Sequence, residues 1–255
     1  MNYALIFAGG VGLRMNSKAL PKQFLQINSK PIIIHTIEHF DEHPEIDAIC
    51  VVCVSEWLDH MRIFLEKYNI RKVCRLVAGG KSALESQYLG LKAIGENAGK
   101  DDIVLIHDGV RPMVDEKTIT ECIASVRKYG SGVCVAPATE TVVRVDDNGF
   151  IQSTVLRSEF MLARAPQAFY LPDILRVHDQ AVRDQNHNFI DSTTMMLAYH
   201  EKVHIVQGSE ENLKVTTPAD FYICKALLDA RNLLSCTDYS EGIYGLSERR
   251  SGIAC

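Results

Sequence analysis

A short glycine-rich loop near the N-terminus carries the residue types that bind phosphate. The apolar residues 3–7 lead into Ala8-Gly-Gly-Val-Gly-Leu-Arg-Met15, and Pro21-Lys-Gln23 follows. Glycine has no Cβ, so backbone N–H groups of such a loop can approach a phosphate closely. Arg14 and Lys22 add fixed positive charge. The loop therefore predicts a polyphosphate site, and its cations indicate that the polyphosphate reacts there.

This loop has two other interpretations. An ordinary strand-to-helix turn with scattered surface charge accounts for many glycine-rich loops. The dinucleotide motif G-x-G-x-x-G needs a third glycine and an acidic residue about 20 positions later. Leu13, Arg14 and Met15 follow Gly12, so the third glycine is missing, and the Walker pattern is missing too. A dinucleotide-dependent oxidoreductase is therefore disfavoured.

A carboxylate and a second lysine complete the predicted chemistry. Asp108 follows the apolar residues 103–107 in His107-Asp-Gly-Val-Arg-Pro112. Mg²⁺ takes one or two carboxylates together with phosphate oxygens, so beside a phosphate loop Asp108 is a candidate metal ligand. An aspartate that caps the turn before Gly109 is the alternative. Lys214 precedes a helix whose Pro218 suits its first turn, and it either reaches across the site or is a solvated charge.

The sequence offers no nucleophile with an adjacent base in a plausible context. One reaction does not need such a pair. A phosphate monoester has a second pKa near ~6 and is mostly dianionic at neutral pH, so it has no proton to remove. Its attack on the α-phosphorus of a nucleoside triphosphate requires alignment and charge neutralisation, which cations and backbone amides supply.

The positions of apolar residues predict an α/β fold in which strands alternate with helices. Continuous apolar strands followed by helical patterns are typical of a mostly parallel sheet covered on both faces. Ligands bind at the carboxyl ends of such strands, so we expect segments 8–14, 78–86 and 107–112 on one rim. The expected strands are 3–7, 48–54, 72–77, 103–107, 133–136 and 203–206. The expected helices are 32–40, 57–68, 82–93, 116–128, 172–180, 192–199 and 218–233.

Residues 141–157 interrupt this alternation. Two apolar segments, 142–145 and 150–156, flank Asp146-Asp-Asn-Gly149, which is a strong hairpin-turn signal. A two-stranded hairpin is only marginally stable alone, so we expect it to pack on a second subunit or, as a local flap, on its own chain. We expect one domain over residues 1–235 that carries this arm, with 236–255 as a loosely attached tail.

Composition excludes several classes of protein. A chain of 255 residues can form one large α/β domain, and its net charge of −5 argues against a general binder of nucleic acid or of anionic membranes. No stretch has the apolar length of a transmembrane helix, and the N-terminus lacks a signal-peptide pattern. We expect a cytoplasmic protein.

The cysteines and histidines do not predict a metal site. Cys50 and Cys53 lie three apart in one predicted strand, so they point to opposite faces of the sheet and cannot share one ion. The cysteines at 74, 122, 134 and 224 stand singly in apolar segments, where we expect reduced core thiols. His35, His39 and His43 have helical spacing, but no carboxylate or cysteine joins them at ligand spacing.

The motifs together resemble a known family. They are the loop 8–15 with Pro21-Lys-Gln23, the segment 107–112, Ala165-Pro-Gln-Ala-Phe169 and Asn212-Leu-Lys-Val-Thr216. In this order they are similar to the cytidylyltransferases that act on sugar-alcohol phosphates, which include the methylerythritol-phosphate and ribitol-phosphate enzymes. The resemblance covers about residues 1–235. It implies a Rossmann-like nucleotidyltransferase fold, CTP and Mg²⁺ as co-substrates, release of pyrophosphate, and a homodimer.

The resemblance also implies three groups of site residues. The catalytic residues that stabilise charge at the phosphates would be Arg14, Lys22 and Lys214. The nucleotide would be bound by Ala8, Gly9, Gly10, Gly12, Gly80, Lys81 and Ser86. The acceptor would be bound by Asp108, which also holds the metal, and by Arg111, Thr141, Arg157 and Asp191.

Several residues depart from the family pattern. Lys81 and Ala83 stand where an acidic residue and an arginine are usual, so a nucleotide-binding regulator without catalytic activity stays an alternative. Ala165 replaces a threonine, and the family's Thr-Asp-Glu/Asp-Ala segment reads Ile190-Asp-Ser-Thr here. Segments 21–25, 30–38 and 55–60 look more similar to ribitol-phosphate enzymes of wall and capsule synthesis. We therefore expect D-ribitol 5-phosphate as acceptor, with 2-C-methyl-D-erythritol 4-phosphate of isoprenoid synthesis as the alternative.

Overall fold

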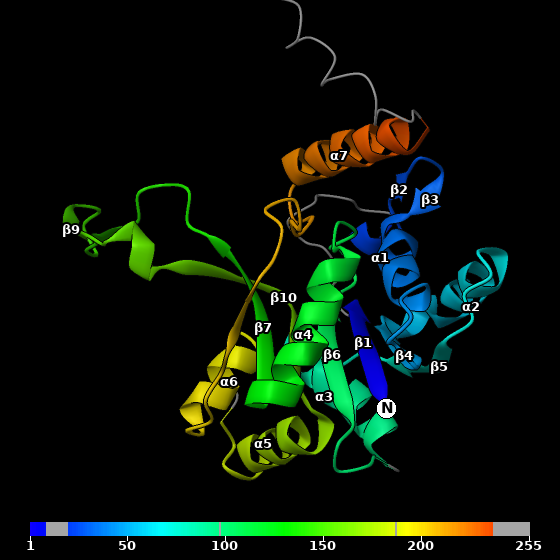
Figure 1. Ribbon diagram of the computed structural model, residues 1–255, viewed down its shortest axis with the longest axis horizontal. Coiled ribbons are helices and arrows are strands. Elements are labelled where there is room, and N and C mark those ends of the chain that lie inside the picture. The colour runs from blue at the N-terminus through cyan, green and yellow to red at the C-terminus, as the bar shows by residue number, and fades with distance from the viewer. Residues whose placement is uncertain (9–19, 97, 187, 237–255) are drawn as a thin grey trace, which may run out of the picture.

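A computed structural model describes residues 1–8, 20–96, 98–186 and 188–236 (Figure 1). The predicted nucleotide-binding residues Gly9, Gly10 and Gly12 and the predicted catalytic residue Arg14 lie outside the described residues. The predicted tail also lies outside them, except for Cys236, which ends the last helix.

The centre of the molecule is a seven-stranded sheet in the order β11-β7-β10-β6-β1-β4-β5. All neighbouring strands are parallel except β10, which runs antiparallel to both β6 and β7. The mostly parallel α/β sheet predicted from the sequence is thus confirmed. The strands are β1 (Asn2–Ala8), β4 (Ala48–Cys53), β5 (Val73–Ala78), β6 (Ile103–Asp108), β7 (Ser131–Pro137), β10 (Met161–Tyr170) and β11 (Ile205–Gln207).

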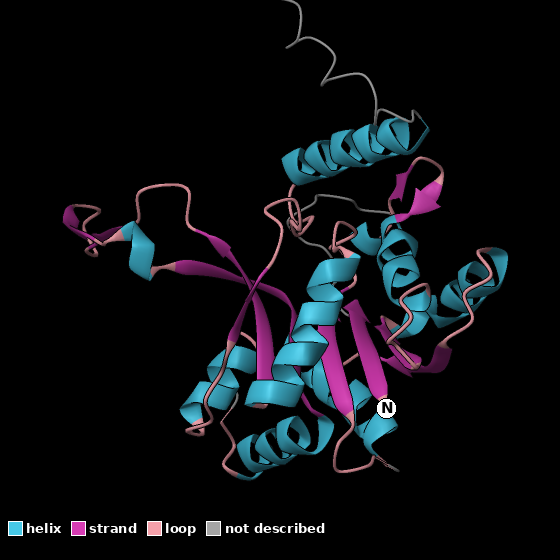
Figure 2. Cartoon of the chain, viewed as in Figure 1, coloured by secondary structure: helices cyan, strands magenta, loops and turns pink. Residues whose placement is uncertain are grey.

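Helices cover both faces of the sheet, and each face has its own core (Figures 1 and 2). One face packs on α1 (Ile32–Asp41), α2 (Leu58–Lys67) and α4 (Glu116–Tyr129). The other packs on α3 (Ala83–Gly95), α5 (Leu171–Arg183) and α6 (Ser192–Ala198). Cys53 belongs to the first core and Cys50 to the second, which confirms that these two thiols point to opposite faces.

The last helix, α7 (Pro218–Cys236), packs apart from the two main cores. Its buried residues Cys224 and Leu228 contact a third apolar cluster that includes Ile27 and Val110. Ile27 ends the short strand β2 (Gln26–Ile27), which pairs with β3 (Lys30–Pro31). Val110 follows strand β6, so α7 closes the molecule over the end of the sheet at which β1 and β6 finish (Figure 1).

The described cysteines are free thiols, as predicted, but Cys74 is exposed, which corrects the expectation that it is a core residue. The reason is its position in β5, the edge strand of the sheet, where one side has no neighbouring strand. The histidines at helical spacing hydrogen-bond to backbone oxygens. His35 and His39 bond to the carbonyl oxygens of Ile27 and Pro112. No group of three or more metal-ligating side chains occurs among the described residues.

Two further strands, β8 (Val143–Val145) and β9 (Ile151–Thr154), pair antiparallel and are joined to the body by β7 and β10. Together they project from the side of the molecule (Figure 1). Strand β10 was not predicted, because Arg164 and Pro166 interrupt its apolar pattern. Its pairing with β7 shifts between Ala163 and Gln167, at the proline. In the described part of the chain, no helix is long and apolar enough to cross a membrane.

Candidate functional site

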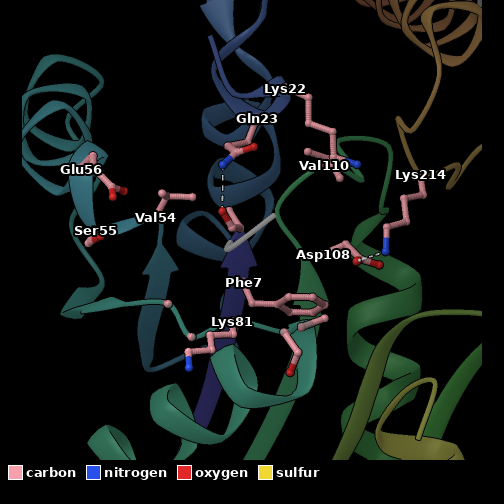
Figure 3. Close-up of a pocket in the computed structure, with 15 residues that line it drawn as sticks. Phe7, Lys22, Gln23, Val54, Ser55, Glu56, Lys81, Asp108, Val110 and Lys214 are labelled. Atoms are coloured by element: carbon pink, nitrogen blue, oxygen red, sulfur yellow. Dashed lines mark hydrogen bonds and ion pairs between the residues drawn. The ribbon is translucent and has the colours of Figure 1, made fainter. Parts of the chain in front are cut away.

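A cavity of about 490 Å³ opens at the carboxyl ends of four parallel strands (Figure 3). Ala8 and Asp108 end β1 and β6, Val54 follows β4, and Gly79 follows β5. Its size lies within the range of small-molecule sites. Segments 78–86 and 107–112 therefore meet on one rim with the described end of the N-terminal loop. Of the predicted site residues, the cavity brings together Ala8, Lys22, Gly80, Lys81, Asp108 and Lys214.

Lys22 is positioned by its buried neighbour. The short 3-10 helix η2 (Lys22–Phe24) follows Pro21, and the Gln23 amide donates to the carbonyl oxygen of Ala8 at 2.8 Å. This bond ties η2 to the end of β1. The Lys22 ammonium donates to the carbonyl oxygen of Val215 at 3.0 Å, one residue after Lys214. Two lysines from distant parts of the chain thus face one cavity.

Asp108 is a buried carboxylate held between two cations. Its Oδ2 accepts a hydrogen bond from Arg111 Nε at 2.8 Å, and its Oδ1 lies 2.6 Å from Lys214 Nζ (Figure 3). Burial alone would raise the pKa of Asp108, but Arg111 and Lys214 lower it to about 2. Asp108 is therefore ionised at neutral pH, and its charge is neutralised inside the protein.

Side chains of helix α1 hold the turn that carries Asp108 and Arg111. Thr36 Oγ1 donates to the carbonyl oxygen of Gly109 at 3.2 Å, and His39 Nε2 bonds to that of Pro112 at 3.0 Å. His107 Nε2 bonds to the Arg111 carbonyl oxygen at 3.2 Å, and burial lowers the pKa of His107 to about 3. These uncharged side chains hold the turn by hydrogen bonds to its carbonyl oxygens. The sequence did not reveal this role, because only the fold brings α1 next to the turn.

The loop between β5 and α3 is ordered by its own side chains. Ser82 caps α3 by accepting a hydrogen bond from the Glu85 N–H at 3.1 Å. The Glu85 carboxylate accepts from the Lys81 N–H at 2.7 Å, and Ser86 Oγ accepts from the Gly80 N–H at 3.1 Å. A Cβ at Gly80 would lie 2.4 Å from Glu85 Cγ, so glycine is required there for this arrangement. Ser86 is thus a buried residue that holds the loop in place, whereas Lys81 is exposed on the rim.

A second cavity, of about 220 Å³, adjoins the first. Both are lined by Phe7, Ala83, Asp108 and Lys214, so the Asp108–Lys214 ion pair lies where they meet. The second cavity also contains two residues predicted to bind the acceptor, Arg111 and Asp191. Its remaining lining residues are Gln87, Ile106, Ala163, Arg164, Ala165, Gln167 and Ile190.

Asp191 has two roles in this second cavity. Its Oδ1 accepts from the Thr194 N–H at 2.8 Å, which caps helix α6, and its Oδ2 accepts from Gln167 Nε2 at 2.9 Å. Thr141 and Arg157, the other two residues predicted to bind the acceptor, line neither of these cavities. Both are on the exposed arm, where Arg157 donates to the Thr139 carbonyl oxygen at 2.9 Å.

Comparison with known proteins shows the family. A family model described as IspD, 2-C-methyl-D-erythritol 4-phosphate cytidylyltransferase, matches residues 3–230. The chain belongs to the IspD family of cytidylyltransferases. The resemblance read from the separated motifs is thereby confirmed, and the protein is an enzyme of CTP-dependent cytidylyl transfer.

The relatives of this family member carry two kinds of name. A ribitol-5-phosphate cytidylyltransferase of Streptococcus agalactiae serotype III is 48% identical over 96% of this chain and 100% of its own length. One of Vibrio parahaemolyticus is 46% identical over 92% of this chain and 98% of its own. A 2-C-methyl-D-erythritol 4-phosphate cytidylyltransferase of Clostridium botulinum is 36% identical over 89% of this chain and 97% of its own length.

A solved structure gives the same fold. The 4-diphosphocytidyl-2C-methyl-D-erythritol synthase of Anaerococcus prevotii superposes with a TM-score of 0.78 at 27% identity, covering 89% of this chain and 96% of its own. The Rossmann-like nucleotidyltransferase architecture expected for this cytidylyltransferase is therefore confirmed.

The ion pairs of Asp108 should make the folding stability of this IspD-family member depend on pH. Because the pKa of Asp108 is about 2 when folded and near ~3.9 when unfolded, the pairs stabilise the fold above about pH 4, and the stabilisation is lost as the pH falls toward 2. Asp108→Asn should lower the free energy of unfolding at pH 7 by on the order of 2 kcal/mol or more, since it also leaves two cations unpaired. Urea unfolding measures this.

The control for this variant is Asp59→Asn, at an exposed carboxylate on α2 that forms an ion pair with Arg62. Asp59→Asn should change the free energy of unfolding little at pH 7 or at pH 3. The difference between wild type and Asp108→Asn should shrink at pH 3, and a difference that stays constant with pH would contradict the assignment of the ion pairs.

Proposed function

We propose that this enzyme transfers CMP from CTP to D-ribitol 5-phosphate and produces CDP-ribitol and pyrophosphate. The observation that carries the proposal is the pair of adjoining cavities that meet at Asp108 and Lys214. The larger suits a nucleoside triphosphate, and the smaller suits a compact polar acceptor. The names of the Streptococcus agalactiae and Vibrio parahaemolyticus relatives support ribitol 5-phosphate as that acceptor.

The proposed chemistry needs no general base. An oxygen of the acceptor's phosphate dianion forms a bond to the α-phosphorus of CTP, and the bond from that phosphorus to the β-phosphate oxygen breaks. Six negative charges enter with CTP⁴⁻ and the dianion, and six leave with CDP-ribitol and pyrophosphate, so no proton is transferred. Lys22 and Lys214 stabilise the charge that develops on the phosphate oxygens, because both line the nucleotide cavity.

Mg²⁺ is the proposed metal, bound with CTP. Asp108 fits it as an ionised carboxylate on the cavity wall, and Mg²⁺ needs only one or two carboxylates in addition to phosphate oxygens. Lys214, 40% exposed on a flexible stem, can transfer its contact from Asp108 to a phosphate and leave the carboxylate oxygen available. The ion would neutralise charge on the triphosphate.

A second acceptor is favoured by a specific observation. The family model and the Clostridium botulinum relative are both named for 2-C-methyl-D-erythritol 4-phosphate. In the second cavity, however, Ala165 and Ile190 offer methyl groups and a butyl side chain where that family pattern has side chains with hydroxyls. The acceptor hydroxyls must therefore be recognised by other groups of this cavity.

A panel of acceptors tests the proposed function. With CTP and Mg²⁺, pyrophosphate release should be fastest with D-ribitol 5-phosphate, slower with 2-C-methyl-D-erythritol 4-phosphate and slowest with glycerol 3-phosphate. Removing the metal with EDTA should abolish turnover, and added MgCl₂ should restore it. Preference for methylerythritol phosphate would reverse the proposed acceptor. Tight CTP binding without turnover of any acceptor would indicate the nucleotide-binding regulator.

The charge of Lys22 should act on the reaction rate. Lys22→Ala should lower kcat by about 10²–10³, the usual effect of removing one electrostatic stabiliser. Lys22→Arg should keep part of the rate because it keeps the charge. Lys117→Ala, at an 81% exposed lysine on α4, is the control. Thermal unfolding checks that all three fold, and near-normal turnover of Lys22→Ala would remove this residue from the catalytic set.

The arm supports a proposed homodimer. It exposes large apolar side chains, with Phe150 71% and Ile151 66% exposed, and a two-stranded hairpin is marginal without a partner surface. Ile190, at the acceptor cavity, is 89% exposed as well. We propose that each arm packs on a second copy of the chain and supplies Thr141 and Arg157 to its acceptor cavity, where Arg157 binds the acceptor phosphate.

Deletion of the arm tests this assembly. Replacing residues 142–156 by a short glycine turn should give a monomer that still binds CTP, with a KM for the acceptor raised at least about tenfold. Phe150→Ser with Ile151→Ser is the milder variant, and Ile63→Ser, at a 60% exposed isoleucine on α2, is its control. Sedimentation and acceptor kinetics measure both effects. A fully active wild-type monomer would leave the arm as a local flap.

A further inference from the structure

Arg164 is a half-buried guanidinium in the wall of the acceptor cavity, and none of the motifs includes it. It lies in β10, directly before Ala165. We propose that Arg164 binds the phosphate group of the acceptor from within the same chain. This inference rests on the proposed function, because it assumes that the second cavity holds the phosphate monoester.

The first support is charge. Among the described residues, Arg111 and Lys214 each form an ion pair with Asp108, whereas Arg164 has no carboxylate within ion-pair distance. The cavity is lined by three cations, Arg111, Arg164 and Lys214, and by two carboxylates, Asp108 and Asp191. One positive charge is therefore in excess. A polyol chain is neutral and cannot balance it, whereas a phosphate dianion can.

The second support is the cost of burying this cation. Burial and then the neighbouring Arg111 lower the pKa of Arg164, and together they outweigh Cys134 and Glu210, which raise it, so its charged form is disfavoured where it lies. A partly desolvated cation with no carboxylate at ion-pair distance destabilises the free protein, and a bound anion reduces that penalty. Arginine is well suited to this role because its planar fork matches phosphate oxygens.

The third support is how Arg164 is held. Its Nη1 donates to the carbonyl oxygens of Glu210 and Asn212 at 2.9 and 2.8 Å. Arg111 Nη1 donates to the same Asn212 oxygen at 2.9 Å, so two guanidinium groups converge on one atom. Asn212 is fixed in turn, because its Nδ2 donates to the Ala165 carbonyl oxygen at 2.7 Å.

These bonds orient Arg164 without using all its donors. A guanidinium has five N–H groups, and in the described part of the chain only Nη1 of Arg164 makes hydrogen bonds. Nε and Nη2 keep three N–H groups for a ligand. Two like charges beside one carbonyl oxygen also repel each other, which a phosphate placed between them would reverse. Arg164 is thus preorganised for an anion and differs from Arg157, which lines neither cavity of its own chain.

The test compares Arg164→Gln and Arg164→Lys with wild type in the CTP- and Mg²⁺-dependent assay. Arg164→Gln should raise the KM for D-ribitol 5-phosphate about tenfold or more, with the KM for CTP within about twofold of wild type. Arg164→Lys should recover part of the loss. Arg176→Gln, at a half-exposed arginine on α5 that pairs with Glu201, is the control for removing a guanidinium.

Inhibition by inorganic phosphate distinguishes an Arg164 that binds the acceptor phosphate from one that has only a structural role. It should compete with the acceptor in wild type, and its inhibition constant should rise in Arg164→Gln by about the same factor as the KM. If both KM values rise equally, or if the inhibition constant does not change, Arg164 only ties β10 to residues 210–212 and the inference is overturned.

Failure of the proposed function gives a different result. Wild type would then turn over none of the polyol phosphates or would prefer 2-C-methyl-D-erythritol 4-phosphate. Calorimetry with inorganic phosphate would still decide the inference in that case. Binding by wild type that is lost in Arg164→Gln supports an anion site at this residue, whereas equal binding by both, or none by wild type, overturns it.

Discussion

The site is organised around a carboxylate that the fold buries and then neutralises with two cations. Asp108 would not be stable as a charge at the end of β6 without Arg111 and Lys214, and their attraction outweighs the cost of its burial. Each partner comes from a different place: Arg111 from the same turn, and Lys214 from a segment about a hundred residues later. The charge of Asp108 thus helps to hold the segment around Lys214 against the end of the sheet, and it places the lysine where the two cavities join.

Neutral side chains complete this arrangement. Two carbonyl oxygens of the 108–112 turn, those of Gly109 and Pro112, accept hydrogen bonds from Thr36 and His39 of α1, which add no charge. Gln23 does the same for the end of β1. Unpaired backbone groups at strand ends are costly when buried, so each of these bonds offsets a penalty that any site at the end of a parallel sheet must meet. The result is a rim whose charges are held at fixed positions by uncharged supports.

Much of this structure could be predicted from the order of residues. Apolar runs such as Ala48–Cys53 predicted central strands because burial on both faces leaves little choice of residue type. The segments that form the rim could be predicted from strand direction alone, because parallel strands end at the same edge of the sheet. Asp108 and Gly80 were therefore expected at one edge. Local sequence could not show that Lys214 pairs with Asp108, or that Cys74 lies on an edge strand. Both depend on contacts between distant segments. Arg164 was missed for the same reason, since its partners are backbone oxygens near residue 211 that carry no sequence signal.

The walls of the second cavity differ in how freely they can change during evolution. Asp191 caps α6 and holds Gln167, so a substitution that altered its contact with a ligand would also weaken the fold. Ala165 and Ile190 line the same cavity with apolar side chains that take no part in hydrogen bonding. Ile190 is 89% exposed, so mutations there can reshape the cavity while the scaffold keeps its stability, whereas Ala165 is buried and tolerates less change in volume. Divergence among acceptors within this family is therefore expected to accumulate at such unconstrained wall positions, while the carboxylate and amide beside them stay fixed.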